Sequence, residues 1–132
     1  MPFVAKHRFC RIAPRKARLV MDLIRGRDVD DAINLLRFSK QRASVFIEKV
    51  IRSAVANANE QDVAQSRNAL YVAEAFVDPG PVIKRFQPKD RGKAYPINKR
   101  TSHLVVTIDA REDNKPAPKQ SSVGARPGKA RV

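Results

Sequence analysis

The sequence predicts an α+β fold in which three helices pack on a small antiparallel sheet, with an extended β-hairpin arm and a disordered basic C-terminal tail. Apolar residues recur at helical spacing through the first half of the chain. Two stretches of alternating apolar residues follow, and a long basic segment lies between them. A length of 132 residues suits one domain, which we place at residues 1–109 with the tail at 110–132.

The first strand and the first helix are expected in the opening 26 residues. Residues 3–12 are typical of a short strand, and its polar side would carry Lys6, Arg8 and Arg11. Pro14 suits the first turn of a helix that runs through Arg25, and Gly26 suits its C-terminal cap. The apolar face of this helix comprises Ala17, Val20, Met21 and Ile24. The opposite, exposed side comprises Arg15, Lys16 and Arg18.

Two further helices are expected before residue 61. Asp28 is a good N-cap for a short helix, and Ser39 is a candidate cap for a longer one. The buried stripe of the short helix comprises Ala32, Leu35 and Leu36. The clearest helical period in the chain comprises Ala43, Ile47, Val50, Ile51, Ala54 and Ala58. Residues 61–68 are polar and predict a loop.

A strand begins near Ala69, and we expect Leu70, Val72 and Phe76 to share its apolar face. In a later strand Leu104, Val106 and Ile108 share a face. The intervening segment, residues 82–103, predicts an antiparallel hairpin with about ten residues per strand, which would project roughly 30 Å. Its turn would be Asp90-Arg91-Gly92-Lys93. Because this hairpin has too few apolar residues for a core of its own, we expect an external partner to order it.

The net charge of +14 is unevenly distributed along the chain. Residues 1–27 hold eight Lys or Arg against one acid, and residues 82–103 hold seven against one. Residues 28–81 hold six against eight. Such segregation is typical of proteins that bind the phosphates of nucleic acid. Two aromatic residues near the tip of the hairpin, Phe86 and Tyr95, either pack across it or stack on unpaired bases.

Other function classes receive little support. The single cysteine, Cys10, excludes an internal disulfide, and no stretch is long and apolar enough to span a membrane. The spacing His7-x-x-Cys10 lacks further ligands for a structural zinc site, so we expect no metal, cofactor or catalytic centre. The alternative to RNA binding is a DNA-binding regulator that places the helix beginning at Pro14 in a major groove. That alternative leaves the hairpin and the tail unexplained.

Five short motifs that characterise one protein family occur in this chain in the family's order: Ala5-Lys6-His7-Arg8, Lys16-Ala17-Arg18-Leu19-Val20, Gly80-Pro81, Arg91-Gly92-Lys93-Ala94 and Lys99-Arg100-Thr101-Ser102-His103. With them the chain closely resembles the bacterial large-subunit ribosomal protein of family twenty-two over about residues 4–109. The resemblance implies a cytoplasmic structural protein, not an enzyme and not a homo-oligomer. It implies binding to large-subunit ribosomal RNA and contact with neighbouring ribosomal proteins. It also implies a hairpin tip that lines the peptide exit tunnel and meets the nascent polypeptide.

The same resemblance implies which residues contact RNA. The hairpin residues expected to face RNA are Lys84, Arg85, Lys89, Arg91, Lys93, Lys99, Arg100 and His103. The body residues expected to anchor it are Lys6, Arg8, Arg11, Arg15, Lys16 and Arg18. The tunnel tip would comprise Lys89, Asp90, Arg91, Gly92 and Lys93, with Gly92 providing the tight turn. Asp90 departs from the family at a tip position that is usually small or basic, and Pro96 and Asn98 stand where basic residues are common.

Overall fold

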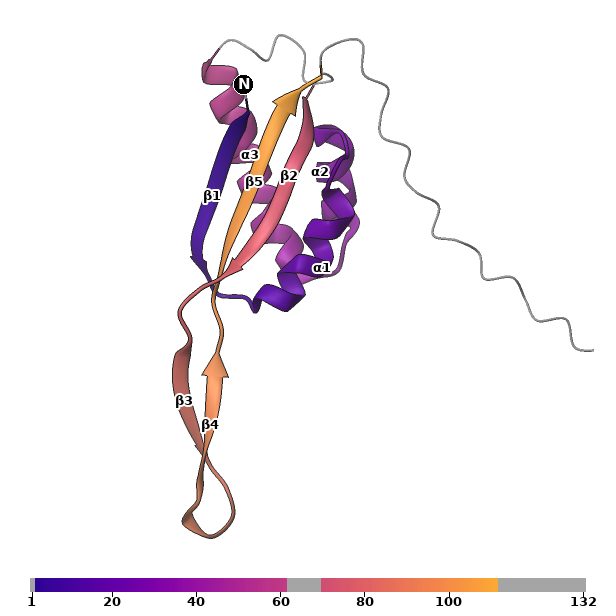
Figure 1. Ribbon diagram of the computed structural model, residues 1–132. Helices are drawn as coiled ribbons and strands as arrows, with labels where there is room; N and C mark the ends of the chain where they lie inside the picture. The colour runs from indigo at the N-terminus through magenta and orange to yellow at the C-terminus, as the bar shows by residue number, and fades with distance from the viewer. Residues whose placement is uncertain (1, 62–69, 112–132) are drawn as a thin grey trace, which may run out of the picture.

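The computed structural model describes residues 2–61 and 70–111 and has an α+β architecture, which confirms the predicted fold class (Figure 1). The expected loop at 61–68 and the tail at 110–132 lie almost wholly outside the described residues. The elements run in the order β1 (Phe3–Cys10), α1 (Pro14–Ile24), α2 (Val29–Phe38), α3 (Arg42–Glu60), β2 (Leu70–Pro79), β3 (Ile83–Pro88), the short 3-10 turn η2 (Asp90–Gly92), β4 (Ala94–Lys99) and β5 (Ser102–Ala110).

The body is a two-layer structure in which helices cover one face of an antiparallel sheet of order β1-β5-β2 (Figure 1). In its register Ala5 pairs with Val106, and Val106 pairs with Ala75, so these three side chains form one row beneath the helices. The central strand β5 is buried on both faces, since Leu104 is fully buried and Val105 on the opposite face is only 7% exposed.

The helices bury the faces that their apolar spacing predicts. All four residues of the predicted α1 face and all six of the predicted α3 face are buried. Pro14 occupies the first helical turn of α1, where its missing N–H costs no hydrogen bond. Gly26 has φ +77°, the left-handed conformation that ends helices and favours glycine. The sequence therefore predicted the start of this helix and, to within one residue, its end, since α1 stops at Ile24 rather than Arg25.

The predicted cap of the third helix is wrong. α3 begins at Arg42 with Gln41 at the N-cap position, whereas Ser39 lies at the C-cap of α2 and its N–H donates to the Leu36 carbonyl. Asp28 does occupy the N-cap position of α2, but its side chain makes no capping hydrogen bond. Its carboxylate instead forms an ion pair with Arg111 at 2.9 Å, which ties the end of β5 to the start of α2.

The predicted apolar face of β2 is wrong in its second half. Leu70 and Val72 are buried as expected, but the register with β5 shifts between Val72 and Glu74. One extra residue in a strand reverses the face of every side chain that follows it. Ala75 and Val77 therefore point into the core, and Phe76 lies on the outer face, 43% exposed.

The hairpin arm is a separate two-stranded sheet that extends from one end of the body (Figure 1). Its ladder joins Ile83 to Lys99 and Pro88 to Ala94, six residues per strand, so the paired part spans about 20 Å rather than the expected 30 Å. The arm and the body are linked at the root. There the Gly80 N–H donates to the Thr101 carbonyl at 2.9 Å, and the Thr101 hydroxyl donates to the Pro81 carbonyl at 2.6 Å.

Candidate nucleic-acid interface

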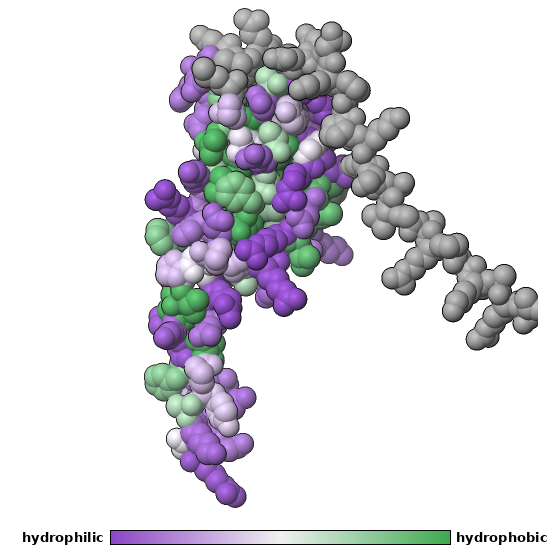
Figure 2. Space-filling model, in the orientation of Figure 1, coloured by the Kyte–Doolittle hydropathy of each residue, from purple (hydrophilic) through white to green (hydrophobic). Residues whose placement is uncertain are grey.

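The arm consists almost entirely of exposed side chains. Every side chain from Lys84 to Pro96 is exposed, and Figure 2 shows hydrophobic and hydrophilic residues mixed along the arm, with hydrophilic residues at its tip. The predicted cations Lys84 and Arg85 are neighbours on β3, so they point to opposite faces of the ribbon. The arm can therefore offer positive charge on both faces to a surrounding polyanion.

The tip is a tight turn of the kind that its sequence predicts. Arg91 and Gly92 both have positive φ, at 54° and 75°, and the Lys93 N–H donates to the Asp90 carbonyl at 3.2 Å. Two consecutive positive φ values are the signature of a type I′ hairpin turn. The turn places Lys89, Asp90, Arg91 and Lys93 within five consecutive residues, and all four side chains are exposed. The Lys89 ammonium lies 5.3 Å from the centre of the Tyr95 ring.

The two aromatic residues of the arm do not pack against each other. Phe86 pairs with Pro96 in the ladder and Tyr95 pairs with Gln87, so the two rings lie on opposite faces of the ribbon. Phe86 is 75% exposed and Tyr95 is 47% exposed. Both rings keep a face that a base could stack on.

Five cations gather where the arm joins the body. They line a hollow of about 320 Å³, and no carboxylate is among the residues that line it. We call this set the arm-root cluster; it comprises Arg11, Lys16, Arg42, Lys99 and Arg100. Four of the five were predicted to contact RNA, but Arg42 was not, because it belongs to a segment whose net charge is negative. Its position at the start of α3, beside the end of β1, brings it into the cluster.

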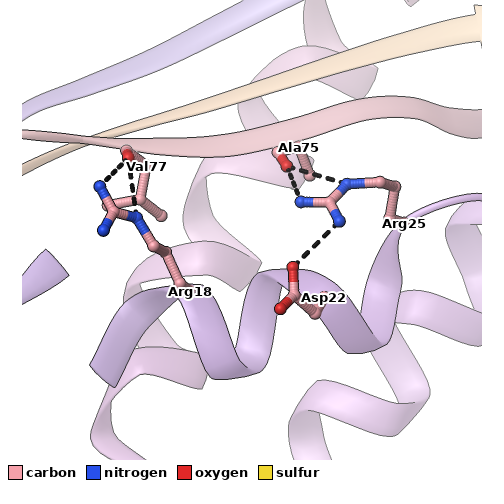
Figure 3. Close-up of polar contacts among 5 residues, drawn as sticks. All are labelled: Arg18, Asp22, Arg25, Ala75 and Val77. Atoms are coloured by element: carbon pink, nitrogen blue, oxygen red, sulfur yellow. Dashed lines mark hydrogen bonds and ion pairs between the residues drawn. The ribbon is translucent and has the colours of Figure 1, made fainter. Parts of the chain in front are cut away.

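Arg18 makes a contact within the body, as does its neighbour Arg25 (Figure 3). The Arg18 guanidinium donates to the Val77 carbonyl at 3.1 and 3.3 Å. Arg25 donates to the Ala75 carbonyl at 2.6 and 3.2 Å and is paired with the Asp22 carboxylate at 2.9 Å. Both acceptors belong to β2, an edge strand whose outward carbonyls would otherwise lack partners.

The remaining predicted residues fall into two places. Lys6, Arg8 and His103 line a second hollow on the sheet face opposite the helices. Arg15 is exposed on α1 and lines neither this hollow nor the arm-root cluster. The structure thus places ten of the fourteen predicted residues in three groups, namely the tip, the arm-root cluster and the outer sheet face. The other four, Arg15, Arg18, Lys84 and Arg85, lie outside these groups.

The buried cysteine is held in its neutral form. Burial raises the pKa of the Cys10 thiol above its ordinary value of 9.0, while the nearby Arg42 guanidinium acts in the opposite direction. A protonated thiol is neither a metal ligand nor a nucleophile. Within residues 2–61 and 70–111, no three His, Cys, Asp or Glu side chains cluster as metal ligands would. The helices described there are also too short or too polar to cross a membrane.

Comparison with known proteins gives a consistent result. The family model described as ribosomal protein L22p/L17e matches residues 5–109. The large ribosomal subunit protein uL22 of Lactobacillus helveticus is 53% identical over 109 residues, which cover 83% of this chain and 92% of that protein. The protein of the same name from Lactobacillus gasseri is 52% identical over the same length and shares. The one from Lacticaseibacillus casei is 53% identical over 102 residues, covering 77% of this chain and 86% of that protein.

The matched range contains the whole sheet apart from its outermost residues, all three helices and the complete arm. The family assignment therefore rests on the same residues that build the body, the arm-root cluster and the tip. No catalytic or cofactor chemistry is needed to account for them. The chain belongs to the ribosomal protein L22p/L17e family, whose members are structural components of the ribosome rather than enzymes.

Proposed function

We propose that this chain, a structural constituent of the large ribosomal subunit, binds large-subunit ribosomal RNA through the arm and the arm-root cluster, and so stabilises the fold and assembly of that RNA. The observation that carries the proposal is the arm-root cluster. Five cations without a carboxylate among them line one hollow at the junction of arm and body. Held apart from RNA, these charges repel one another; phosphates placed between them relieve the repulsion and release counterions.

The mechanism is binding by shape and charge. The body, residues 1–109 without the arm, acts as a folded anchor, and the arm at 82–103 enters between RNA segments. Most contacts go to phosphates, which fix the register without reading base sequence. Exposed Phe86 and Tyr95 add stacking on unpaired bases. The basic tail at 110–132 adds further phosphate contacts. Neighbouring large-subunit proteins contact the body, and the chain acts as a single copy.

Salt dependence of binding to a large-subunit RNA fragment tests the proposal. The logarithm of the association constant should fall with the logarithm of salt concentration by about 0.7 to 0.9 for each phosphate contacted. The double variant Lys99→Ala/Arg100→Ala should reduce that slope by about two, and Arg42→Ala should reduce it by about one. Lys40→Ala/Lys49→Ala is the matched control, because both lysines are exposed and lie outside the cluster. Equal slopes for the two double variants would contradict the proposal.

The tip is the part proposed to line the peptide exit tunnel. Its cations Lys89, Arg91 and Lys93 lie at the far end of the arm, away from the body (Figure 1). A photoreactive amino acid at position 91 should cross-link to a stalled nascent chain within assembled ribosomes. The same group at position 49 on α3 should not. Equal cross-linking from both positions would remove the tunnel from the proposal and leave the RNA contacts unaffected.

A further inference from the structure

The outer face of the sheet, which none of the described helices covers, carries a second hollow with a different chemistry. We call it the outer hollow; its volume is about 280 Å³. Its lining comprises Lys6, Arg8, Phe9, Phe76, Asp78 and His103, with Val105 between them on the central strand. Figure 2 views this face and shows hydrophobic surface in the middle of the body with hydrophilic residues beside it. Unlike the arm-root cluster, the outer hollow combines cations, aromatic rings and one carboxylate.

The register of the sheet places these side chains in two adjacent rows. Lys6 and Phe76 both pair with Val105, which gives the row Lys6–Val105–Phe76 across the three strands. Asp78 pairs with His103 in the next row toward the arm. Side chains in the same row or in neighbouring rows on one face lie within reach of a single small ligand.

Phe9 is held toward the hollow by an unusual backbone. The pairing of β1 with β5 is irregular between His7 and Cys10, and Phe9 has φ 57°, which is costly for a bulky residue. Its N–H donates to His103 Nδ1 at 3.0 Å, and the two rings meet edge to face at 4.9 Å. The strained backbone leaves the Phe9 ring 61% exposed instead of buried. Strain that exposes an aromatic ring at the rim of a hollow points to a binding role.

The carboxylate indicates which ligand fits. A surface that bound only phosphate would gain nothing from Asp78. A carboxylate can instead accept two parallel hydrogen bonds, and guanine is the base whose pairing edge offers two adjacent donors, N1–H and N2–H. Because Nδ1 of His103 accepts from Phe9, a neutral ring carries its proton on Nε2, which is a donor. Exposed Phe9 and Phe76 offer stacking surfaces, and Lys6 and Arg8 offer charge for the flanking phosphates.

We propose that the outer hollow binds one unpaired guanine of an RNA strand. The base stacks on the exposed aromatic rings, Asp78 accepts from its pairing edge, and Lys6 and Arg8 neutralise the adjacent phosphates. The excess of cations over carboxylates in the lining favours an anionic strand over an apolar protein partner. The ligand class rests on the proposed RNA-binding function, but the base preference belongs to the outer hollow alone.

Four RNA pentamers of equal charge test the inference: UUGUU, UUAUU, UUCUU and UUUUU. Each is titrated into the full chain at fixed salt while backbone amide NMR signals are followed. We expect UUGUU to bind about tenfold more tightly than the others, since a good bidentate base contact discriminates by about that factor. The largest shifts are expected at Phe9, Phe76 and His103. Equal affinity of all four pentamers, or shifts confined to the arm, would overturn the inference and would favour a protein partner for this face.

Two variants distinguish specific recognition of guanine from simple electrostatic attraction of the RNA strand. Asp78→Asn removes a negative charge, so attraction alone would tighten all four pentamers equally. Base reading predicts instead that the preference for UUGUU disappears. Phe76→Leu keeps apolar cover but removes the stacking face, and it should weaken UUGUU about tenfold. Phe38→Leu on α2 is its control, because Phe38 is 89% exposed and lies outside the outer hollow.

The two proposals fail separately. If Asp78→Asn keeps the guanine preference, the outer hollow does not read guanine, although arm-root variants still weaken binding to the ribosomal RNA fragment. If arm-root variants bind that fragment normally while Asp78→Asn loses the preference, the proposed function fails and the guanine site stands.

Discussion

The body and the arm differ in how many of their side chains are buried. The body encloses a continuous core in which Ile24, Ile51 and Leu104 are fully buried. The arm buries no side chain between Lys84 and Pro96, and its backbone pairs only within its own two strands. Burial of apolar surface is what offsets the entropy of ordering a chain, and the arm has almost none of it. We therefore expect the body to fold alone and the arm to depend on what surrounds it.

The two regions also use arginine differently. In the body, Arg18 and Arg25 are bound to β2 carbonyls and help to complete the edge of the sheet (Figure 3). At the tip, Arg91 lies on the turn with its side chain exposed. A basic residue near the N-terminus is thus not equivalent to one in the hairpin, although both contribute equally to the net charge. The contrast can be tested by substitutions, from the largest expected effect to the smallest.

The largest contrast should appear between a core residue and an arm residue. Leu104→Ala removes a fully buried side chain from the central strand, and it should cost about 2–5 kcal/mol of unfolding free energy. Phe86→Ala removes a larger side chain that is 75% exposed, and it should change that free energy by less than about 0.5 kcal/mol. Urea unfolding of both variants measures the difference. Comparable losses would show that the arm belongs to the cooperative unit of the body.

The next effect concerns the arginines that cover β2. Arg25→Ala removes both hydrogen bonds to the Ala75 carbonyl, and we expect a loss of about 1 kcal/mol because the side chain is half exposed. Arg15→Ala at the opposite end of α1 is the control, since Arg15 is exposed and its loss should cost only a few tenths of a kcal/mol. Thermal unfolding compares the two. A loss for Arg15→Ala as large as that for Arg25→Ala would refute the edge-covering role.

An effect of similar size on stability is expected at the root, where Thr101 joins arm to body. Thr101→Val keeps the shape but loses the hydroxyl that donates to the Pro81 carbonyl, at a cost of about 1 kcal/mol. Thr101→Ser keeps the hydroxyl. Spin labels at positions 49 and 91 should report a broader distance distribution for the valine variant than for the serine variant. Identical distributions would mean that this hydrogen bond does not set the direction of the arm.

The smallest effect on global stability is expected at the tip. Gly92 has φ +75°, so Gly92→Ala strains the turn by roughly 1–2 kcal/mol. Because the arm lies outside the core, the unfolding free energy of the body should stay within about 0.5 kcal/mol. The damage should appear instead as NMR shift changes confined to the arm. A lower midpoint of urea unfolding would contradict this independence.

Local patterns predicted the elements well because their causes are local. Helical spacing identified the faces of α1 and α3, and the turn residues located the tip at Asp90–Lys93. The error over the cap of α3 is a local one, a shift of two residues from Ser39 to Gln41, whereas the error in β2 arises from contact between distant segments. The extra residue before Glu74 is visible only in the pairing with β5, so Phe76 was placed on the wrong face.

In the candidate site, too, local sequence predicted some features, and contacts between distant segments determined the others. Charge segregation identified the two basic segments, residues 1–27 and 82–103, that supply the cations of the arm and four of the five cations of the arm-root cluster. Arg42 was not predicted, because it belongs to residues 28–81, whose net charge is negative. Only the fold brings this arginine to the root of the arm. The bond from Arg18 to the Val77 carbonyl joins residues 59 positions apart, which no local pattern can reveal. The outer hollow likewise depends on the register of three strands.

The central claim is that the body orders itself and the arm is ordered by RNA. Hydrogen exchange of the full chain, free and bound to a large-subunit RNA fragment, tests it most directly. In the free chain we expect strong protection of amides in β5 and near-intrinsic exchange across residues 84–99, with protection of the arm appearing only when RNA is added. Slow exchange across residues 84–99 in the free chain would contradict the claim.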